Sequence, residues 1–196
     1  VGQVILNFGE ISNCASLHDG KSFEGKGGAV YLAGPQSDFV MNDGKFTGNE
    51  ATDFGGAIYA EGGAHFTMNA GVISKNKCSD GIGGAVCVSG YFNQTLPTVY
   101  SEFNFNGGRI VENAAKNNGG AISVDYYATA NIAGGEISKN SVISNSLENG
   151  GGAIYIFNIG EANISGNARI TENFAAGVGG AILIKNDKTS STLQFE

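Results

Sequence analysis

Apolar residues occupy every second position in short segments spread along the whole chain, and Gly or Asn separates one segment from the next. Val30 and Leu32 flank Tyr31 in this way, and the same alternation recurs at Ile58–Ala60 and Ile154–Ile156. Alternation with a period of two is typical of a β-strand with one buried face. None of these segments is long enough for a helix. The pattern therefore predicts short strands joined by tight turns.

The segments belong to a repeat of about 28 residues, which a Gly-Gly-Ala-[Val/Ile] motif marks six times. A second element runs from an aliphatic or aromatic residue to an Asn three positions later. Cys14 stands at the Asn position of the first copy. The alanines of the first motif are Ala29, Ala57, Ala85, Ala121, Ala153 and Ala181, and the asparagines of the second are Asn49, Asn76, Asn113, Asn140 and Asn173. Two of the units are enlarged, and each unit is expected to hold three strands.

Identical elements that recur once per unit are expected to stack on their counterparts in the next unit. We therefore predict an all-β fold: a single-stranded, right-handed parallel β-helix of the pectate-lyase-like solenoid kind. It would have about six coils of about 28 residues, in one domain spanning residues 1–196, and we expect this domain to be a fragment of a longer surface protein. The first predicted interior column is Val30, Ile58, Val86, Ile122, Ile154 and Ile182, and another is Ile11, Phe46, Ile73, Ile110, Ile137 and Ile170.

Two polar columns are interpreted as structural. The repeated Asn stands where a strand must turn, and Asn tolerates the left-handed αL conformation and can bond the coil above. The residues that precede each Asn, and those that precede each apolar start, alternate in charge between consecutive charged copies, which fixes the register of neighbouring strands. Glu112 and Glu172 would otherwise resemble paired catalytic carboxylates, but Lys139 lies in the coil between them.

Composition narrows the function classes. The chain has 32 Gly and 2 Pro among 196 residues, as many tight turns would require, and its net charge of −7 argues against nucleic-acid partners and anionic membrane surfaces. The three cysteines include no Cys-x-x-Cys pair, and the two histidines have no metal-type spacing. We predict no catalytic residue, no metal ligand and no cofactor.

Aromatic residues supply the candidate binding positions. The outward column of one predicted strand contains Tyr31, Tyr59 and Tyr155, whose rings could stack on sugars or simply cover the sheet. Three segments are longer than the basic unit requires: Ala15–Lys26, Ser89–Glu102 and Ser141–Gly150. Loops carry function on rigid scaffolds, although a tolerated surface insertion is the alternative. The second of these segments is the most aromatic, and its candidate ligand-binding residues are Tyr91, Phe92 and Tyr100.

The two motifs in fixed order, from Val4 to about Lys185, resemble the repeats of polymorphic outer-membrane proteins and of adhesin-like right-handed β-helix proteins on cell surfaces. Only Phe46 gives the Phe-x-x-Asn form; the other copies begin with Ile. The resemblance implies an extracellular or cell-surface adhesin or scaffold segment. Its partner would be a protein or glycan of a host or cell surface, with no membrane contact by this segment.

Two other functions stay open. A parallel β-helix can bind carbohydrate without catalysis, here through the Tyr column or the Ser89–Glu102 insertion. It can also be a polysaccharide lyase or glycoside hydrolase, which needs clustered Asp or Glu on adjacent coils. No such cluster is visible in the sequence, so we predict a protein that is not an enzyme.

Overall fold

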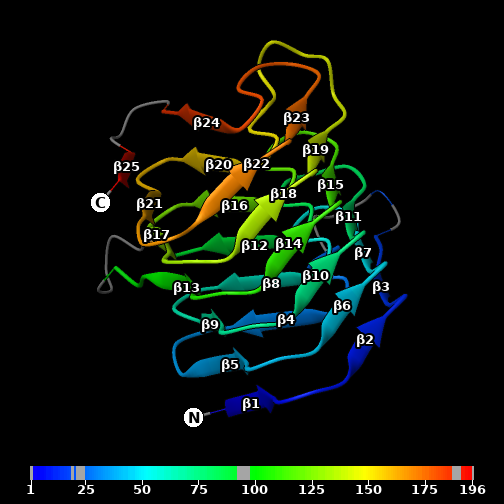
Figure 1. The fold of residues 1–196 in the computed structure, drawn as a ribbon, viewed down its shortest axis with the longest axis vertical. Coiled ribbons are helices and arrows are strands. Elements are labelled where there is room, and N and C mark those ends of the chain that lie inside the picture. The colour runs from blue at the N-terminus through cyan, green and yellow to red at the C-terminus, as the bar shows by residue number, and fades with distance from the viewer. Residues whose placement is uncertain (1, 19, 21–24, 92–97, 187–190, 196) are drawn as a thin grey trace.

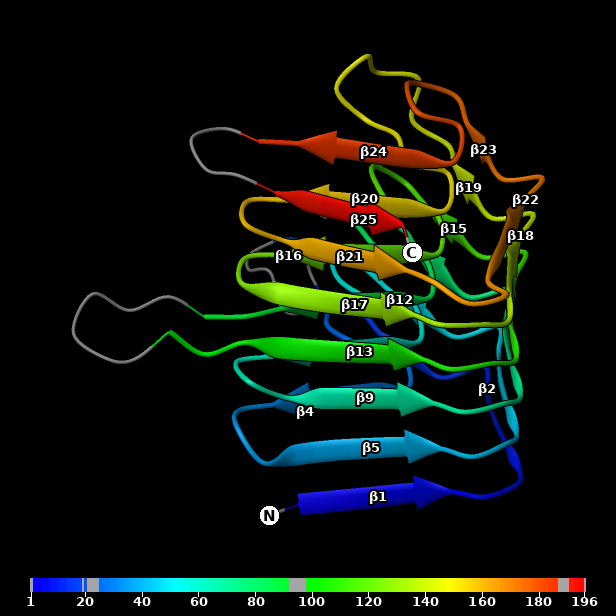
Figure 2. The same ribbon diagram turned by 60° about the vertical axis from the view of Figure 1, so that its left-hand side comes forward.

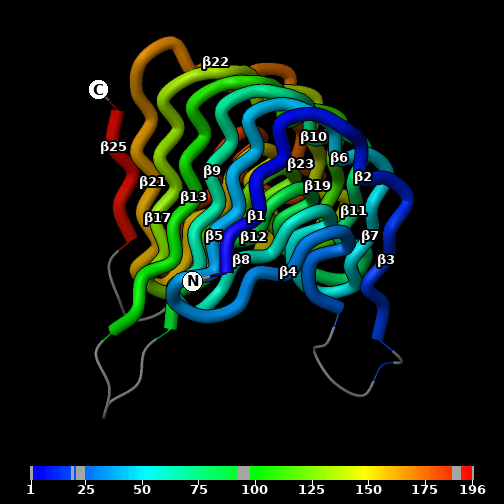
Figure 3. Tube along the Cα trace, turned by 90° about the horizontal axis from the view of Figure 1, so that it is seen from below, coloured from blue at the N-terminus to red at the C-terminus, as the bar shows by residue number. Residues whose placement is uncertain are grey.

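The structure, a computed structural model, describes residues 2–18, 20, 25–91, 98–186 and 191–195. These residues contain no helix and form 25 strands in four sheets, whose strand pairs are all parallel. The chain winds upward as a rod with one strand per sheet in each turn (Figure 1). Viewed from the N-terminal end, it runs clockwise as it recedes (Figure 3), which is a right-handed helix. The predicted right-handed parallel β-helix is confirmed.

The first sheet contains the longest strands, and the second contains the most charged ones. Figure 2 looks onto the first sheet. The first sheet consists of β1 (Gly2–Leu6), β5 (Ser37–Met41), β9 (His65–Met68), β13 (Ser101–Phe105), β17 (Ala128–Ile132), β21 (Glu161–Ile164) and β25 (Thr192–Phe195). The second consists of β2 (Glu10–Ser12), β6 (Lys45–Thr47), β10 (Val72–Ser74), β14 (Arg109–Val111), β18 (Glu136–Ser138) and β22 (Arg169–Thr171).

The other two sheets complete each coil. The third consists of β3 (Ala15–Ser16), β7 (Glu50–Ala51), β11 (Lys77–Cys78), β15 (Ala114–Ala115), β19 (Ser141–Val142) and β23 (Phe174–Ala175). The fourth consists of β4 (Val30–Ala33), β8 (Ile58–Glu61), β12 (Val86–Ser89), β16 (Ile122–Asp125), β20 (Ile154–Phe157) and β24 (Ile182–Lys185). The expectation of three strands per unit is therefore wrong by one, because the strands of the third sheet have only two residues, too few to show alternation in the sequence.

The predicted interior columns form the core. Ile58, Val86, Ile122 and Ile154 pair with one another in register on the fourth sheet and are fully buried. On the first sheet, the rings of Phe66 and Phe103 stack with centroids 4.9 Å apart. Burial of such side chains contributes about 1.5–3 kcal/mol each, so these columns supply most of the free energy of folding.

The two glycines of the Gly-Gly-Ala-[Val/Ile] motif are required for different geometric reasons. Gly55 has a φ of +61°, and a Cβ there would lie 2.0 Å from the carbonyl oxygen of Ile58. A Cβ on Gly56 would lie 2.2 Å from the carbonyl oxygen of Gly84 in the next coil. The first glycine is therefore required by the turn and the second by the close approach of neighbouring coils.

The repeated asparagines form a continuous ladder inside the turn between the second and third sheets. The side-chain amide of Asn76 donates to Oδ1 of Asn113 at 2.9 Å, and Asn113 donates to Asn140 at the same distance. The hydrogen-bonding prediction is confirmed. The prediction that the Asn itself adopts the αL conformation is wrong. The residue before each Asn has the positive φ instead, as in Lys75 (+57°) and Glu112 (+58°). This arrangement leaves the Asn side chain pointing inward to bond its neighbours.

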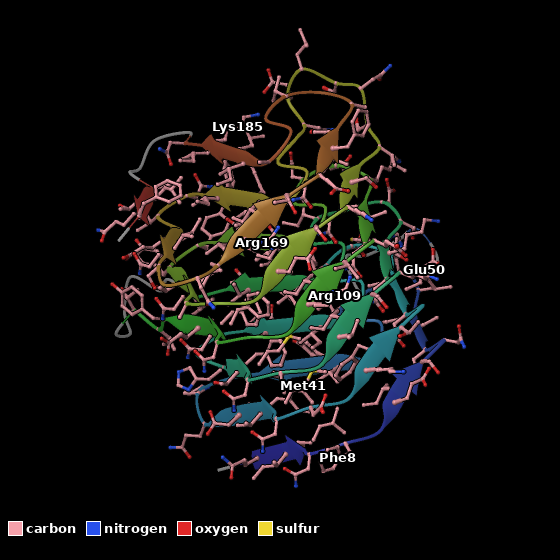
Figure 4. All side chains as sticks on the ribbon, in the orientation of Figure 1. Phe8, Met41, Glu50, Arg109, Arg169 and Lys185 are labelled. Atoms are coloured by element: carbon pink, nitrogen blue, oxygen red, sulfur yellow. The ribbon has the colours of Figure 1, made fainter. Side chains whose placement is uncertain are left out.

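The predicted charge columns lie on the solvent side of the second sheet and of the turn that follows it. Figure 4 labels Arg109 and Arg169 on this face. Arg109 pairs with Glu136 at 3.4 Å, and the αL residues pair as Lys75–Glu112 at 3.9 Å and Lys139–Glu172 at 3.7 Å. Exposed pairs of this kind contribute about 0–1 kcal/mol. Their alternation disfavours a shifted register, in which like charges would meet.

Candidate functional site

The outer face of the fourth sheet is the most enclosed outer surface of the rod. Along it runs the outward column Tyr31, Tyr59, Cys87, Ser123, Tyr155 and Leu183. Tyr59 and Tyr155 are each only 5% exposed, whereas Tyr31 is 45% exposed. Of the three predicted column tyrosines, two therefore cover the sheet, and Tyr31 alone offers much of its ring to solvent.

A first aromatic cluster lies at the N-terminal end of this face. The Tyr59 ring stacks on Tyr31 at 5.8 Å and on Phe54 at 5.2 Å between centroids. The Lys26 ammonium lies 5.4 Å from the Tyr31 centroid and 5.6 Å from that of Tyr59, within the range of cation–π attraction. The structure thus brings the predicted Tyr31 and Tyr59 together.

An ion pair between Lys26 and Glu61 lies beside the rings of that cluster, and the pKa values of both groups are shifted. Lys26 donates to both carboxylate oxygens of Glu61, at 3.0 and 3.3 Å, and the Tyr31 hydroxyl donates to the same carboxylate. Burial opposes both charges, yet the hydrogen bonds prevail: the Glu61 carboxylate raises the pKa of Lys26, and the Tyr31, Tyr59 and Lys26 donors lower the pKa of Glu61. Both groups are therefore charged and mutually satisfied at neutral pH.

A second aromatic cluster is centred on Tyr155, three coils beyond Tyr59. The Tyr155 and Phe157 rings stack at 5.7 Å, and the Tyr126 ring meets Phe157 edge-on at 6.1 Å. Tyr126 and Tyr127 form the corner between β16 and β17, with φ values of +34° and +53°. Tyr155 thus lies in a different cluster from Tyr31 and Tyr59, and no single platform contains all three.

Between the clusters lies a cavity of about 310 Å³, which we call the notch. Its floor holds small or short side chains, among them Cys87 and Ser89 of β12 and Asp125 of β16. The residues that line the notch are Lys26, Phe54, Tyr59, Cys87, Ser89, Asp125 and Tyr126.

Asp125 is the chemically unusual group of the notch. It is 9% exposed, and its carboxylate accepts a hydrogen bond from the Tyr126 N–H at 2.9 Å. Among the described residues, no Lys, Arg or His forms an ion pair with it. Burial raises the pKa of Asp125 to about 7. Burial and the nearby Asp125 charge also raise the pKa of the Cys87 thiol, so this cysteine is a neutral part of the floor of the notch.

The predicted Tyr91 and Tyr100 are not among the residues that line the notch, although the insertion begins beside it: the Gly90 N–H donates to the carbonyl oxygen of Tyr126. Tyr91 and Tyr100 are 52% and 59% exposed, and the backbones of Tyr91 and Val99 pair in an antiparallel bridge. Tyr100 also lines a shallow depression that includes His65 and Asp38, whose Nδ1 and Oδ1 atoms lie 3.1 Å apart. The predicted Phe92 falls outside the described residues.

Sequence reasoning missed Phe54, Lys26, Asp125 and Tyr126. One signal was present in the chain: Tyr126-Tyr127 occupies a corner where an earlier coil has Gly62-Gly63 with φ values of +66° and +93°. Bulky residues at positive φ are uncommon and mark sites worth inspection. The position of Phe54 against Tyr59 carries no such signal, because it depends on how the coil folds back.

Other site types find little support in the described part of the chain. No group of three or more His, Cys, Asp or Glu side chains there could hold a metal ion. Cys14, Cys78 and Cys87 form no disulfide. Within the same residues, no helix is long and apolar enough to cross a membrane.

Comparison with known proteins gives one match. Residues 43–61 match the model of the Chlamydia polymorphic membrane protein repeat. The matched stretch runs through β6 and β7 to the end of β8, and it contains both Phe46–Asn49 and the Gly-Gly-Ala-Ile motif at 55–58. No curated protein and no solved structure matches the chain. The expected resemblance to this repeat type is confirmed, and it supports a surface location in general terms.

Proposed function

We propose that this chain is an attachment module displayed at a cell surface, a rigid rod that binds a protein or glycan on a host or other cell. One observation carries the proposal: the stretch that matches a polymorphic membrane protein repeat has the same strand order as the other coils. Stacked repeats give an extended, stiff body in which each coil contacts only its neighbours. Such a body suits display of a binding surface away from its anchor.

The Ser89–Glu102 insertion is the proposed contact with the partner. Its described part exposes Tyr91 and Tyr100, and Tyr100 meets Tyr127 of the scaffold edge-on at 5.8 Å. Tyrosine is enriched at the centre of protein interfaces, because its ring buries a large area at small entropic cost. A loop on a rigid rod can present such rings without deforming the fold.

The proposal includes no catalysis. A glycoside hydrolase needs two carboxyl groups that flank the scissile bond. Glu112 and Glu172 are each paired with a lysine on the solvent side of the rod. Glu61, two coils from Asp125 in the same outward column, accepts hydrogen bonds from Lys26 and Tyr31 and is not among the residues that line the notch. We therefore expect binding without turnover of polysaccharide.

The test is attachment of coated beads to cultured epithelial cells. Beads that carry the rod should attach about tenfold more than albumin-coated beads, because many weak contacts act together on one bead. Tyr100→Ser should reduce attachment, and its far-UV circular dichroism should match the parent because Tyr100 is exposed. Attachment no greater than that of albumin beads, by protein with an intact β-sheet spectrum, would contradict the proposal.

A further inference from the structure

The notch is a gap in an otherwise aromatic face. The outward column of the fourth sheet reads Tyr31, Tyr59, Cys87, Ser123 and Tyr155 from coil to coil. Coils are about 4.8 Å apart, which is close to the separation of stacked rings. The two central coils carry a thiol and a hydroxyl where rings would continue the stack. The cavity of about 310 Å³ is lined by the first of these two residues, Cys87.

The walls of the notch are rings held in place by their own neighbours. Phe54 and Tyr59 stack with an angle of 20° between their planes on one side, and Tyr126 leans on Phe157 at 83° on the other. Tyr126 reaches this position from a corner with positive φ, a conformation that costs energy for a bulky residue. The strained backbone of Tyr126 thus places its ring beside the notch. Strained residues of this kind are typical of binding sites.

The floor offers hydrogen-bonding groups whose capacity is only partly used, since Ser89 also hydrogen-bonds the Tyr59 side chain. The Asp125 carboxyl accepts the Tyr126 N–H through Oδ1, and the Ser89 hydroxyl makes a long contact of 3.4 Å to the Gly90 carbonyl oxygen. Because burial raises the pKa of Asp125 to about 7, the group can both donate and accept near neutral pH. A buried carboxyl with so few partners is costly unless a ligand supplies them.

The same groups decide the class of ligand. A cation would meet the Lys26 ammonium, which also lines the notch. An anion would find that ammonium already neutralised by Glu61 and would face the Asp125 carboxyl. A purely apolar ligand would cover Asp125 without adding a partner to the single Tyr126 N–H that it has. A sugar ring has an apolar face for the aromatic walls and hydroxyls for the floor, and the cavity volume matches small ligands at the lower end of the usual range of about 300–1,000 Å³.

We propose that the notch binds a neutral saccharide residue, which packs against Phe54, Tyr59 and Tyr126 and hydrogen-bonds Asp125 and Ser89. The assignment depends on the notch alone and holds whether or not the rod attaches to cells. Nothing in it requires the exposed Tyr91 or Tyr100.

The test measures direct binding of defined probes to the intact chain. Saturation-transfer NMR and calorimetry would be run with the methyl glycosides of glucose, galactose, mannose, N-acetylglucosamine and N-acetylgalactosamine. Methyl glucuronide and tetramethylammonium would serve as the anionic and cationic comparators. We expect saturable binding in the millimolar range for at least one neutral glycoside, tighter than for either comparator. No saturable binding of any neutral glycoside by folded protein, or tighter binding of a comparator, would overturn the proposal.

Two variants locate the site. Asp125→Leu removes the hydrogen-bonding group and should weaken saccharide binding about tenfold or more, the effect of one lost hydrogen bond to a buried partner. Cys87→Tyr fills the notch with the kind of ring that the preceding coil has at this position, Tyr59, and should abolish binding. If Cys87→Tyr does not fold, Asp125→Leu still decides the question. Undiminished binding by folded Asp125→Leu would refute the assignment to the notch.

A matched control variant distinguishes saccharide binding in the notch from the proposed attachment to cells. Tyr100→Ser alters an exposed ring outside the notch, so saccharide affinity should stay within about twofold of the parent, a change below 0.5 kcal/mol. Loss of bead attachment with retained saccharide binding would contradict neither proposal. A large loss of saccharide affinity in Tyr100→Ser would place the sugar on the insertion instead of in the notch.

Discussion

Two polar columns run side by side through the turn that follows the second sheet, and they differ in burial. One holds the αL residues Lys75, Glu112, Lys139 and Glu172, whose side chains are at least half exposed and pair across coils at 3.7–3.9 Å. The next residue in each turn is the ladder asparagine, and Asn113 and Asn140 are fully buried. Both columns repeat with the coil, so periodicity by itself does not separate them.

Burial sets the contribution of a stacked polar contact to the free energy of folding. Water competes for an exposed ion pair and screens it, so its net contribution is small. Inside the turn, no water replaces a lost partner, and each orphaned donor or acceptor costs about 1–3 kcal/mol. Substitutions in the two columns should therefore differ in the stability that they cost.

Asn113→Ala should give the largest loss. The Asn113 side chain donates to the carbonyl oxygens of Ile73 and Val111 and to Asn140, and its Oδ1 accepts from Asn76. Its removal should lower the free energy of unfolding by about 3–5 kcal/mol, because several of these groups lose their partner while buried. Urea denaturation followed by circular dichroism measures the change.

The control for that substitution is Asn106→Ala. Asn106 belongs to a second ladder, through its donation to Asn69 Oδ1 at 2.9 Å, but this ladder is exposed. We expect a loss below about 1 kcal/mol, because water can replace the bond. Equal losses for the two alanine variants would show that burial does not set the contribution of these hydrogen bonds.

Asp125→Asn tests how burial of a carboxyl group affects stability, as Asn113→Ala does for a buried amide. The folded-state pKa of about 7 lies above the unfolded value near 3.8, so the folded protein holds the extra proton between these values. Stability should therefore fall as pH rises from 4 to 7, by up to about 4 kcal/mol. The asparagine variant should remove this slope and be the more stable protein at pH 8, with urea midpoints measured from pH 4 to 8.

The other titratable groups that line the notch should not contribute to this pH dependence. Lys26, Tyr59 and Cys87 line the same notch, and since the pKa of each is raised, they keep their protons over this range. Asp43→Asn, at an exposed position, is the matched control and should leave the slope unchanged. A slope of parental size in Asp125→Asn would show that another group causes it.

Lys139→Gly should give the smallest effect, on the exposed column. The variant loses the pair with Glu172 but relieves an αL backbone with φ of +57°, and Gly48 already holds the equivalent place in another coil. We expect the free energy of unfolding to change by less than about 1 kcal/mol.

The backbone control at the same site is Lys139→Val. A β-branched residue at positive φ is a steric outlier, so this variant should lose about 1–2 kcal/mol although it removes the same ion pair. If the glycine and valine variants lost equal stability in thermal melts, the ion pair and not the backbone would dominate at this position.

Most of the fold follows from the repeat. The spacing of Ala29, Ala57 and the later alanines, together with period-two alternation, leaves stacked parallel coils as the arrangement in which like elements meet. The buried columns and the Asn ladder were predicted for the same reason. The two-residue strands of the third sheet were not, since alternation needs more residues than Ala15–Ser16 or Lys77–Cys78 provide.

Much less of the candidate site was predictable. The sequence correctly places Tyr59 and Tyr155 on the outward side of their strands, but it does not show that Phe54 and Phe157 cover them. That cover depends on how residues before and after the strand fold back over the outer face. Asp125 looks like an ordinary strand end in the sequence, and its isolation exists only once the aromatic clusters surround it.

The architecture follows from the amino-acid sequence, because strand length, turn glycines and coil register are local properties that recur with every repeat. Tertiary structure alone decided which outward face became enclosed. Enclosure results from contacts between positions that have no fixed spacing, such as Lys26 with Glu61 and Tyr126 with Phe157. For this reason the rod could be predicted from its repeats, whereas the notch appeared only in the folded chain.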